Sequence, residues 1–238
     1  MTNIYDKSIS CAIIQSSYIP WRGYFDLIHQ ADVFVFLDQV QFTRRDWRTR
    51  NRIITANGPT WLSVPVRVRD VFNTSIFDVL LDNSQNWNTT HLKSIKLAYS
   101  KARFFQEIIA ILEPFYLNPP EKLVELNRQL TQALWNSFSG NCPKQFVADE
   151  ELSLGEIKDS NERLISICQK VGANIYYSGP SARDYLRLEQ WRERGIEVRF
   201  MEYNYSNYPQ LYGEFEPGVS VIDTLMNLGP GCISTALS

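Results

Sequence analysis

Five arginines lie within nine residues of the chain, and an aspartate and a tryptophan lie among them. The planar guanidinium fork suits phosphate and carboxylate groups, and an indole can stack on a base or a sugar ring. The pattern favours a clamp for the diphosphate of a nucleotide or nucleotide-sugar; the alternative is a solvated, partly ion-paired turn. The residues concerned are Arg44, Arg45, Arg48, Arg50, Arg52, Asp46 and Trp47, and Gln41 and Asn51 of the same segment complete the predicted binding residues.

Polar and aromatic residues also follow the first apolar run of the chain, between Gln15 and Tyr24. Loops between a strand and a helix often carry binding residues, and the N-terminus of the following helix attracts anions. The alternative is a plain connecting loop, with Trp21 and Tyr24 packed as lids on the core. The binding residues predicted from this loop are Gln15, Ser16, Tyr18, Trp21, Gly23 and Tyr24.

A third segment, Tyr177 to Tyr185, passes from a predicted strand through a turn of small residues into a helix. Backbone N–H groups of such a turn can face a ligand. Neither a GxGxxG nor a GxxxxGK[ST] pattern occurs, so the sequence predicts no dinucleotide fingerprint and no P-loop. The binding residues predicted here are Ser178, Gly179, Ser181 and Tyr185.

Proton transfer at neutral pH is most often the work of histidine, and the chain has only two. His29 lies on the first predicted helix beside polar residues. His91, at the start of a later helix, is therefore the candidate general base, with Asp38 and Asp46 as alternatives; a local structural histidine is the other interpretation. No GxSxG elbow supports a serine triad, and no clustered His or Cys ligands indicate a metal.

Alternating apolar runs predict the elements that position these residues. Strands are expected at 10–15, 33–37, 174–177 and 196–200, and helices at 23–31, 161–171, from the Gly179-Pro180 turn to 194, and at 219–228. A strand, a helix and a strand in so short a stretch form a βαβ unit, which implies a parallel sheet. Ligands of such sheets bind beyond the carboxyl ends of the strands.

Between these two α/β parts the pattern changes. Asn57-Gly58 between two extended runs, at 52–55 and 60–66, predicts a β-hairpin, because both residues tolerate positive φ. Three periodic segments follow at 86–99, 102–116 and 120–138. The sequence thus predicts an α/β protein with a Rossmann-like, parallel-containing sheet, a β-hairpin extension and a helical insert at about 86–138, all in a single domain of residues 1–238.

Composition limits the class of function. The 238 residues carry a net charge of −2, with charges of both signs spread along the chain, which argues against a nucleic-acid binder. The four cysteines are far apart, and Cys11 and Cys168 lie in apolar runs typical of buried thiols. The first ten residues lack the apolar core of a signal peptide, and no apolar stretch reaches the ~20 residues of a membrane span. These features predict a cytoplasmic protein without membrane insertion.

The segments that carry the predicted site resemble the WbqC-like family. The resemblance covers residues 12–53, 61–66, 162–186 and 208–230, together with the spacing of Trp87, His91 and Tyr99. The family is associated with clusters that make O-antigen and other surface or secondary-metabolite glycans, and glycyl or related acyl transfer to an amino sugar has been proposed for it. The resemblance therefore implies carbohydrate modification, without an established catalytic residue.

The opening of the chain is also similar to that of pantothenate synthetase and related nucleotidyltransferase-like proteins, in which an HxGH motif steadies the phosphates of ATP. Here the corresponding residues are Trp21-Arg22-Gly23-Tyr24, and both histidines are absent. The likeness concerns the fold, and the missing histidines argue against standard adenylation.

The function expected from these observations is an acyl- or aminoacyltransferase, glycyl transfer included, that forms an amide on a nucleotide-activated amino sugar. Its acyl donor would be a thioester, or ATP would activate the acid, and no metal is expected. One alternative is an ATP-dependent ligase or nucleotidyltransferase on the same fold. The other is a non-catalytic binding or scaffold subunit of a glycan-assembly complex.

Overall fold

The computed structural model describes residues 8–238. Their contacts divide the chain into two compact units. Of the described residues, the first unit comprises 8–14, 26–37 and 144–203, and the second comprises 15–25, 38–143 and 204–238. Residues 1–7, on which the expected absence of a leader partly depends, lie outside the described range. The single-domain organisation remains a prediction from the sequence.

The first unit is built on a five-stranded sheet whose strands are all parallel. Its spatial order, β7-β2-β1-β8-β9, places the first strand of the chain at the centre. The chain adds β2 and β7 on one side of β1 and then β8 and β9 on the other, as in Rossmann-like folds. The α/β fold class is thereby confirmed. The strands are β1 (Ser10–Ile14), β2 (Val33–Phe36), β7 (Gln145–Ala148), β8 (Ile175–Ser178) and β9 (Glu197–Phe200).

Strand β7 is the one strand of this sheet that the sequence analysis missed. It pairs with β2 at the edge of the sheet, from Val33 opposite Gln145 to Phe36 opposite Ala148. Only its last residue, Ala148, is buried. A four-residue edge strand that begins with an exposed glutamine has neither a continuous apolar run nor a clear alternation, so its sequence carries little signal.

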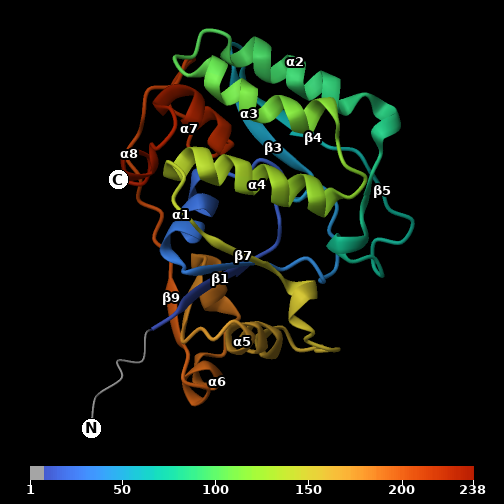
Figure 1. The fold of residues 1–238 in the computed structure, drawn as a ribbon, viewed down its shortest axis with the longest axis vertical. Helices are drawn as coiled ribbons and strands as arrows, with labels where there is room; N and C mark the ends of the chain where they lie inside the picture. Colours follow the sequence, from blue (N-terminus) through green and yellow to red (C-terminus); the bar gives the residue numbers. More distant parts are fainter. Residues whose placement is uncertain (1–7) are drawn as a thin grey trace. The chain divides into compact units, whose positions relative to one another are not determined.

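Helices α5 (Ser160–Lys170) and α6 (Leu188–Glu193) lie together on one side of this sheet (Figure 1). Tyr176 of β8 stacks on Trp191 of α6 with ring centroids 4.8 Å apart, and Cys11 and Cys168 bring their sulfurs within 3.3 Å. The long helix expected before residue 194 is instead a short 3-10 turn, η4 (Pro180–Asp184), followed by α6. Helix α1 (Arg22–Gln30) carries the chain between the two units.

In the second unit, β3 (Arg50–Thr55) and β4 (Gly58–Ser63) form the predicted hairpin. The connection differs in detail from the expectation. Thr55 pairs with Gly58, so Ala56 and Asn57 are the turn residues, and of the pair Asn57-Gly58 only Gly58 has a positive φ, +94°. A glycine of positive φ after a two-residue turn is typical of hairpins that close with a bulge.

Three helices confirm the helical insert: α2 (Trp87–Tyr99), α3 (Phe105–Leu117) and α4 (Leu123–Ser139). They lie beside the hairpin and α7 (Val221–Leu228) in the second unit, as Figure 1 shows. Helices α3 and α4 pack on α7, and Leu112, Leu134 and Leu225 of these three helices are fully buried, as is Ile95 of α2. The remaining elements are β5 (Val66–Arg67), β6 (Leu80–Leu81), α8 (Ile233–Ala236) and the 3-10 turns η1 (Ile76–Asp78), η2 (Asn83–Gln85) and η3 (Asp149–Leu152); η3 belongs to the first unit.

A buried carboxylate joins these elements. Asp223, in the first turn of α7, accepts hydrogen bonds from Tyr99 of α2 (3.0 Å) and from Tyr208 and Gln210 (2.8 Å each). The Tyr99 hydroxyl in turn accepts from the backbone of Ile54 in β3. Three neutral donors and the helix N-terminus satisfy the charge, while burial raises the pKa of Asp223. In residues 8–238, no helix has both the length and the apolar character of a membrane span.

Candidate functional site

Asp38 is the most completely enclosed carboxylate among the predicted catalytic residues. Its side chain is fully buried; Oδ1 accepts the backbone N–H of Ser16 at 2.9 Å, and Oδ2 accepts Nε of Arg128 at 2.8 Å. Burial raises the pKa of Asp38, whereas the charge of Arg128 and the bond from Ser16 oppose that rise. The result is a carboxylate held in a fixed orientation and made more basic by its surroundings.

Three more predicted residues are bonded to one another next to Ser16. Nη2 of Arg48 donates to the side-chain oxygen of Gln15 at 3.3 Å, and the hydroxyl of Tyr24 donates to the carbonyl of Gln15 at 3.2 Å. Burial is the main cause that raises the pKa of Tyr24. The charge of Asp38 raises it further, whereas the charges of Arg48 and Arg128 lower it. The six residues Gln15, Ser16, Tyr24, Asp38, Arg48 and Arg128 form what we call the Asp38 cluster.

Buried polar atoms without a partner mark the same neighbourhood. In the part of the chain that the structure describes, Ser16 Oγ, Arg48 Nε and Asn127 Oδ1 are buried and make no hydrogen bond. The amide nitrogen of Asn127 donates to the carbonyl of Arg48 at 2.9 Å, which ties α4 to the arginine segment. Buried groups are normally satisfied, so these atoms indicate a place for water or a ligand.

The predicted residues His91 and Tyr18 belong to a second group of polar side chains. The hydroxyl of Tyr18 lies 2.8 Å from Nδ1 of His91 and 2.6 Å from the hydroxyl of Tyr116. The imidazole also donates to the backbone of Ser63, but burial outweighs that bond and lowers the pKa of His91 to about 4. His91 is thus a neutral imidazole with both nitrogens engaged and only 5% of its surface exposed.

The backbone fastens the first two predicted segments to each other. The N–H of Tyr18 donates to the carbonyl of Trp47 at 2.9 Å, and the side chain of Asn51 donates to the carbonyls of Tyr18 and Ile19 at 3.3 and 2.9 Å. Gln15–Tyr24 and Asp38–Asn51 therefore meet within the second unit. Asn51 is buried, and its side chain holds the backbone of the loop that contains Tyr18 and Ile19.

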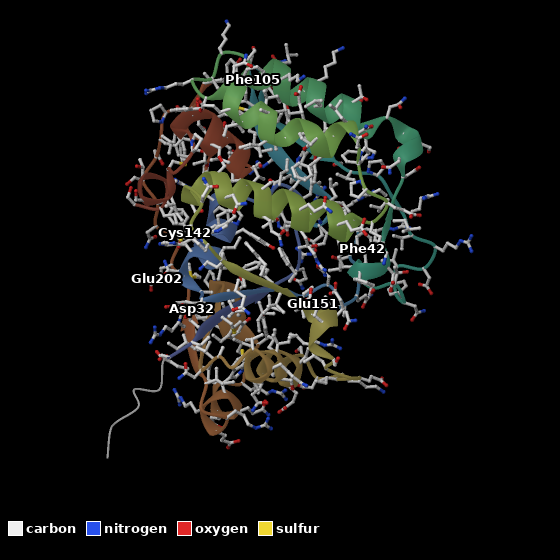
Figure 2. All side chains as sticks on the ribbon, in the orientation of Figure 1. Asp32, Phe42, Phe105, Cys142, Glu151 and Glu202 are labelled. Atoms are coloured by element: carbon white, nitrogen blue, oxygen red, sulfur yellow. The ribbon has the colours of Figure 1, made fainter. Side chains whose placement is uncertain are left out.

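The five arginines take different positions. Arg44 and Arg45 are exposed, whereas Phe42 just before them, labelled in Figure 2, is buried. Arg48 points inward to the Asp38 cluster, with 14% of its side chain exposed. Arg50 and Arg52 lie over the ring of Trp61 at 4.5 and 5.6 Å, and Arg52 also donates to the carbonyl of Gly218 and pairs with Glu216.

Asp46 and Gln41 have local partners. Asp46 accepts from the hydroxyl of Thr43 and the backbone of Trp47, both at 2.6 Å, and lies 3.5 Å from Arg48. This pattern is that of an aspartate that shapes a turn. Gln41 is exposed and forms a backbone bridge with Ser75. Catalysis by Asp46 and binding by Gln41, Arg44 and Arg45 remain predictions.

Trp21 and Gly23 are a matched pair. A Cβ atom on Gly23 would lie 2.3 Å from the six-membered ring of Trp21, so only glycine leaves room for that indole. The other edge of Trp21 meets Tyr205 at 6.3 Å between ring centroids, and its backbone bridges to Ser220. These contacts explain Trp21 and Gly23 by packing.

The third predicted segment belongs to the first unit. Ser178 is buried and donates to the hydroxyl of Tyr176 at 3.2 Å, whereas Ser181 and Tyr185 are exposed. Gly179 stands at the carboxyl end of β8, where a Cβ would come 3.9 Å from the hydroxyl of Tyr203. Substrate binding by these four residues remains a prediction.

The sequence analysis missed Arg128, Asn127 and Tyr116. Asn127 and Thr131 occupy the same stripe of α4 as Leu130 and Leu134, and both are fully buried. Polar residues four apart on an otherwise apolar helical face were the available signal. Within residues 8–238 no group of three or more His, Cys, Asp or Glu side chains is arranged to hold a metal ion.

Comparison with known proteins gives one family and one close relative. The model of the WbqC-like protein family matches residues 15–235. An uncharacterized protein of Mycobacterium tuberculosis (strain ATCC 25618 / H37Rv), Rv1507c, is 42% identical over 220 residues, which cover 92% of this chain and 93% of that protein. No solved structure matches the chain significantly. All six residues of the Asp38 cluster lie within the matched range, and the chain belongs to the WbqC-like protein family.

Proposed function

We propose that this protein is an acyl- or aminoacyltransferase that forms an amide on the amino group of a nucleotide-activated amino sugar. The observation that carries the proposal is the Asp38 cluster, in which one buried carboxylate of raised pKa pairs with Arg128, and Arg48 binds Gln15, the residue next to Ser16. Amide formation on such a substrate needs a base for the amine and cations for the diphosphate. The family resemblance supports the choice of an amino sugar as acceptor.

The base is needed because an amino sugar carries an ammonium group near neutral pH, and an ammonium nitrogen has no free electron pair. In the proposed reaction Asp38 accepts that proton. The free amine then attacks the carbonyl carbon of an acyl thioester, the N–C bond forms, and the C–S bond breaks. The second amine proton leaves with the departing thiolate. Burial raises the basicity of Asp38, and Arg128 keeps it ionised and oriented.

Arg48 provides the anion site. It uses Nη2 for Gln15, while its buried Nε makes no hydrogen bond within residues 8–238, so its guanidinium keeps a donor for a ligand. Its side chain is 14% exposed, which leaves part of it open to a ligand. Asp46 contacts Arg48 only at 3.5 Å and from a more exposed position, so a bound phosphate can replace it.

Asp38 is a better proton acceptor in this proposal than His91. Both imidazole nitrogens already have partners, and a pKa of about 4 makes His91 a weaker base than an unperturbed histidine. Its bond to Tyr18 instead fixes the loop that carries Gln15 and Ser16. We therefore assign His91 a supporting role.

The test is an end-point assay with purified protein, amino-sugar nucleotides and acyl or aminoacyl thioesters, in which mass spectrometry detects the amide product. Asp38→Asn should abolish turnover, and Arg48→Lys should weaken binding of the nucleotide-sugar by roughly tenfold or more, because lysine lacks the planar fork. Arg192→Lys is the matched control, since Arg192 is exposed and lies outside all three predicted binding segments.

Two results would replace the proposal. Amide formation that requires ATP and releases pyrophosphate would make the protein a ligase. Tight binding of a nucleotide-sugar with no product from any donor, with or without ATP, would make it a binding subunit.

A further inference from the structure

Two exposed tryptophans meet on the surface of the second unit. Trp47 and Trp61 are 47% and 44% exposed, and their ring centroids are 5.7 Å apart with an interplanar angle of 36°. The guanidinium of Arg50 lies 4.5 Å from the centroid of Trp61. We call these three residues the Trp47 platform. Exposed aromatic patches with adjacent cations are uncommon on surfaces without a binding role.

The hairpin explains why the platform has this composition. Side chains alternate along a strand, so Arg50 and Arg52 point to one face of β3, while Asn51 and Ile53 point to the buried face. Trp61 stands opposite Arg52 and joins the arginine face, whereas Leu62 is buried. Arg50, Arg52 and Trp61 thus share the outward face of this part of the hairpin, together with the exposed Ser63 opposite Arg50.

The platform is also fixed before any ligand binds. The backbone N–H of Trp47 donates to Asp46, and its carbonyl accepts from Tyr18. Arg52 is held by the carbonyl of Gly218 and by Glu216. Arg50, by contrast, makes no ion pair with any residue between 8 and 238, so its donors are available.

The polar groups around the indoles distinguish a base from a sugar. A sugar ring presents hydroxyls, which require acceptors as well as donors. Arg50 and Arg52 are donors only, and both oxygens of Asp46 already accept from Thr43 and Trp47. A nucleobase needs a flat aromatic surface for its face and donors for its carbonyl and ring-nitrogen acceptors, which this platform supplies.

We propose that the Trp47 platform binds the nucleobase of a nucleotide, with the base stacked on Trp47 and Arg50 donating to its acceptor edge. The inference rests on the proposed function, because it assigns the base and the phosphates of one substrate to neighbouring residues. Trp47 and Arg48 are consecutive, with Cα atoms about 3.8 Å apart. Their side chains can therefore contact adjacent parts of one nucleotide.

Calorimetric titration with adenosine, guanosine, cytidine and uridine diphosphates, and with inorganic pyrophosphate, tests the inference. The wild-type protein should bind at least one nucleoside diphosphate about tenfold or more tightly than pyrophosphate, since stacking on an aromatic side chain contributes on that order. Trp47→Ala should remove this preference and leave pyrophosphate affinity unchanged. Leu97→Ala, which removes an exposed apolar side chain on α2, should change neither affinity.

The outcomes separate this inference from the proposed function. If nucleoside diphosphates bind no more tightly than pyrophosphate, or if Trp47→Ala keeps the preference, the platform assignment is wrong and the arginine site stands. If neither probe binds wild-type protein, both are wrong. Trp47 is exposed, so its variant should fold, and an unchanged melting temperature verifies this before titration.

Discussion

Asp38 and His91 are both buried in the second unit, and burial acts on them in opposite directions. Loss of water disfavours the charged form of any group, so it raises the pKa of the carboxyl and lowers that of the imidazole. Asp38 keeps a cation at 2.8 Å as compensation. His91 has only hydrogen bonds and stays neutral, so protonation of its ring must oppose folding.

Acid should therefore destabilise the protein through His91. The pKa of His91 is about 4 in the folded state against 6.5 for an ordinary histidine, so the unfolded chain binds the proton more tightly. The stabilising contribution is complete above pH 6.5 and is lost as pH falls towards about 4, up to roughly 3 kcal/mol. Urea unfolding should find His91→Gln less stable than wild type at about pH 7.5, and the difference should shrink by about pH 4.5.

His29→Gln is the control, because His29 is exposed. Asp38 and Asp223 have raised pKa values and change stability in the opposite sense, since their contribution falls as pH rises. Wild type, His91→Gln and His29→Gln all contain Asp38 and Asp223, so comparing their stabilities at the same pH cancels the effect of these two carboxyl groups. A stability difference for His91→Gln that stays constant with pH would contradict the neutral, enclosed imidazole.

Removing only one partner of the ion pair between Asp38 and Arg128 should lower the unfolding free energy. Arg128→Met leaves a buried carboxylate without its cation, and the expected loss is roughly 3–5 kcal/mol of unfolding free energy. The double variant Asp38→Asn/Arg128→Met removes both charges and should recover a substantial part of it. Urea unfolding of the four proteins measures the coupling. Additive losses would mean that the pair is not coupled in the folded protein.

At the scale of elements, the start of α1 depends on the fit between Gly23 and Trp21. Gly23→Ala should destabilise the protein by roughly 1–3 kcal/mol, because a Cβ meets the indole at 2.3 Å. In a Trp21→Ala background the same substitution should stabilise by up to about 1 kcal/mol, since alanine favours a helix more than glycine does. Thermal melts of the four proteins test this change of sign. Destabilisation of similar size in both backgrounds would contradict the steric explanation.

Elements with strong patterns could be predicted from the sequence, and weak ones could not. Ser10–Ile14 and Val33–Phe36 are continuous apolar runs, and the three helices of the insert have clear periodicity, so their existence was evident. Strand β7 has no such run. In the hairpin, Asn57-Gly58 correctly indicated a turn, but the register depends on the pairing of Thr55 with Gly58, which local residues do not specify.

The same limit applies to the candidate site. Gln15, Ser16 and Asp38 follow strands, Tyr24 lies in the first turn of α1, and Arg48 precedes β3, so position in the sequence suggests chemistry at each of them. Arg128 lies on a helix ninety residues from its partner Asp38, and only the packing of α4 brings them together. A pattern of residues along one helix can reveal that Asn127 is buried, but not what it contacts.

At the scale of the whole molecule, the chain crosses repeatedly between its two units. The first unit takes three separate stretches of sequence and the second takes three more. Parallel neighbours cannot be joined by a tight turn, so the chain must leave the sheet between strands. The stretch between β2 and β7 contains the hairpin and α2, α3 and α4. Such interleaving makes independent folding of either unit difficult, so we expect the two units to unfold together.

The cysteines can test whether the two units unfold together. Cys11 and Cys168 are fully buried in the first unit, Cys232 is 6% exposed in the second, and Cys142 is exposed. Native protein should thus react with a thiol reagent mainly at Cys142. With increasing urea, pulse labelling and peptide mass spectrometry should find Cys11, Cys168 and Cys232 labelled at one common midpoint, as expected for a cooperative domain. Labelling of Cys232 at clearly lower urea than Cys11 and Cys168 would instead mean that the second unit unfolds while the sheet of the first remains, and the chain would then contain two domains.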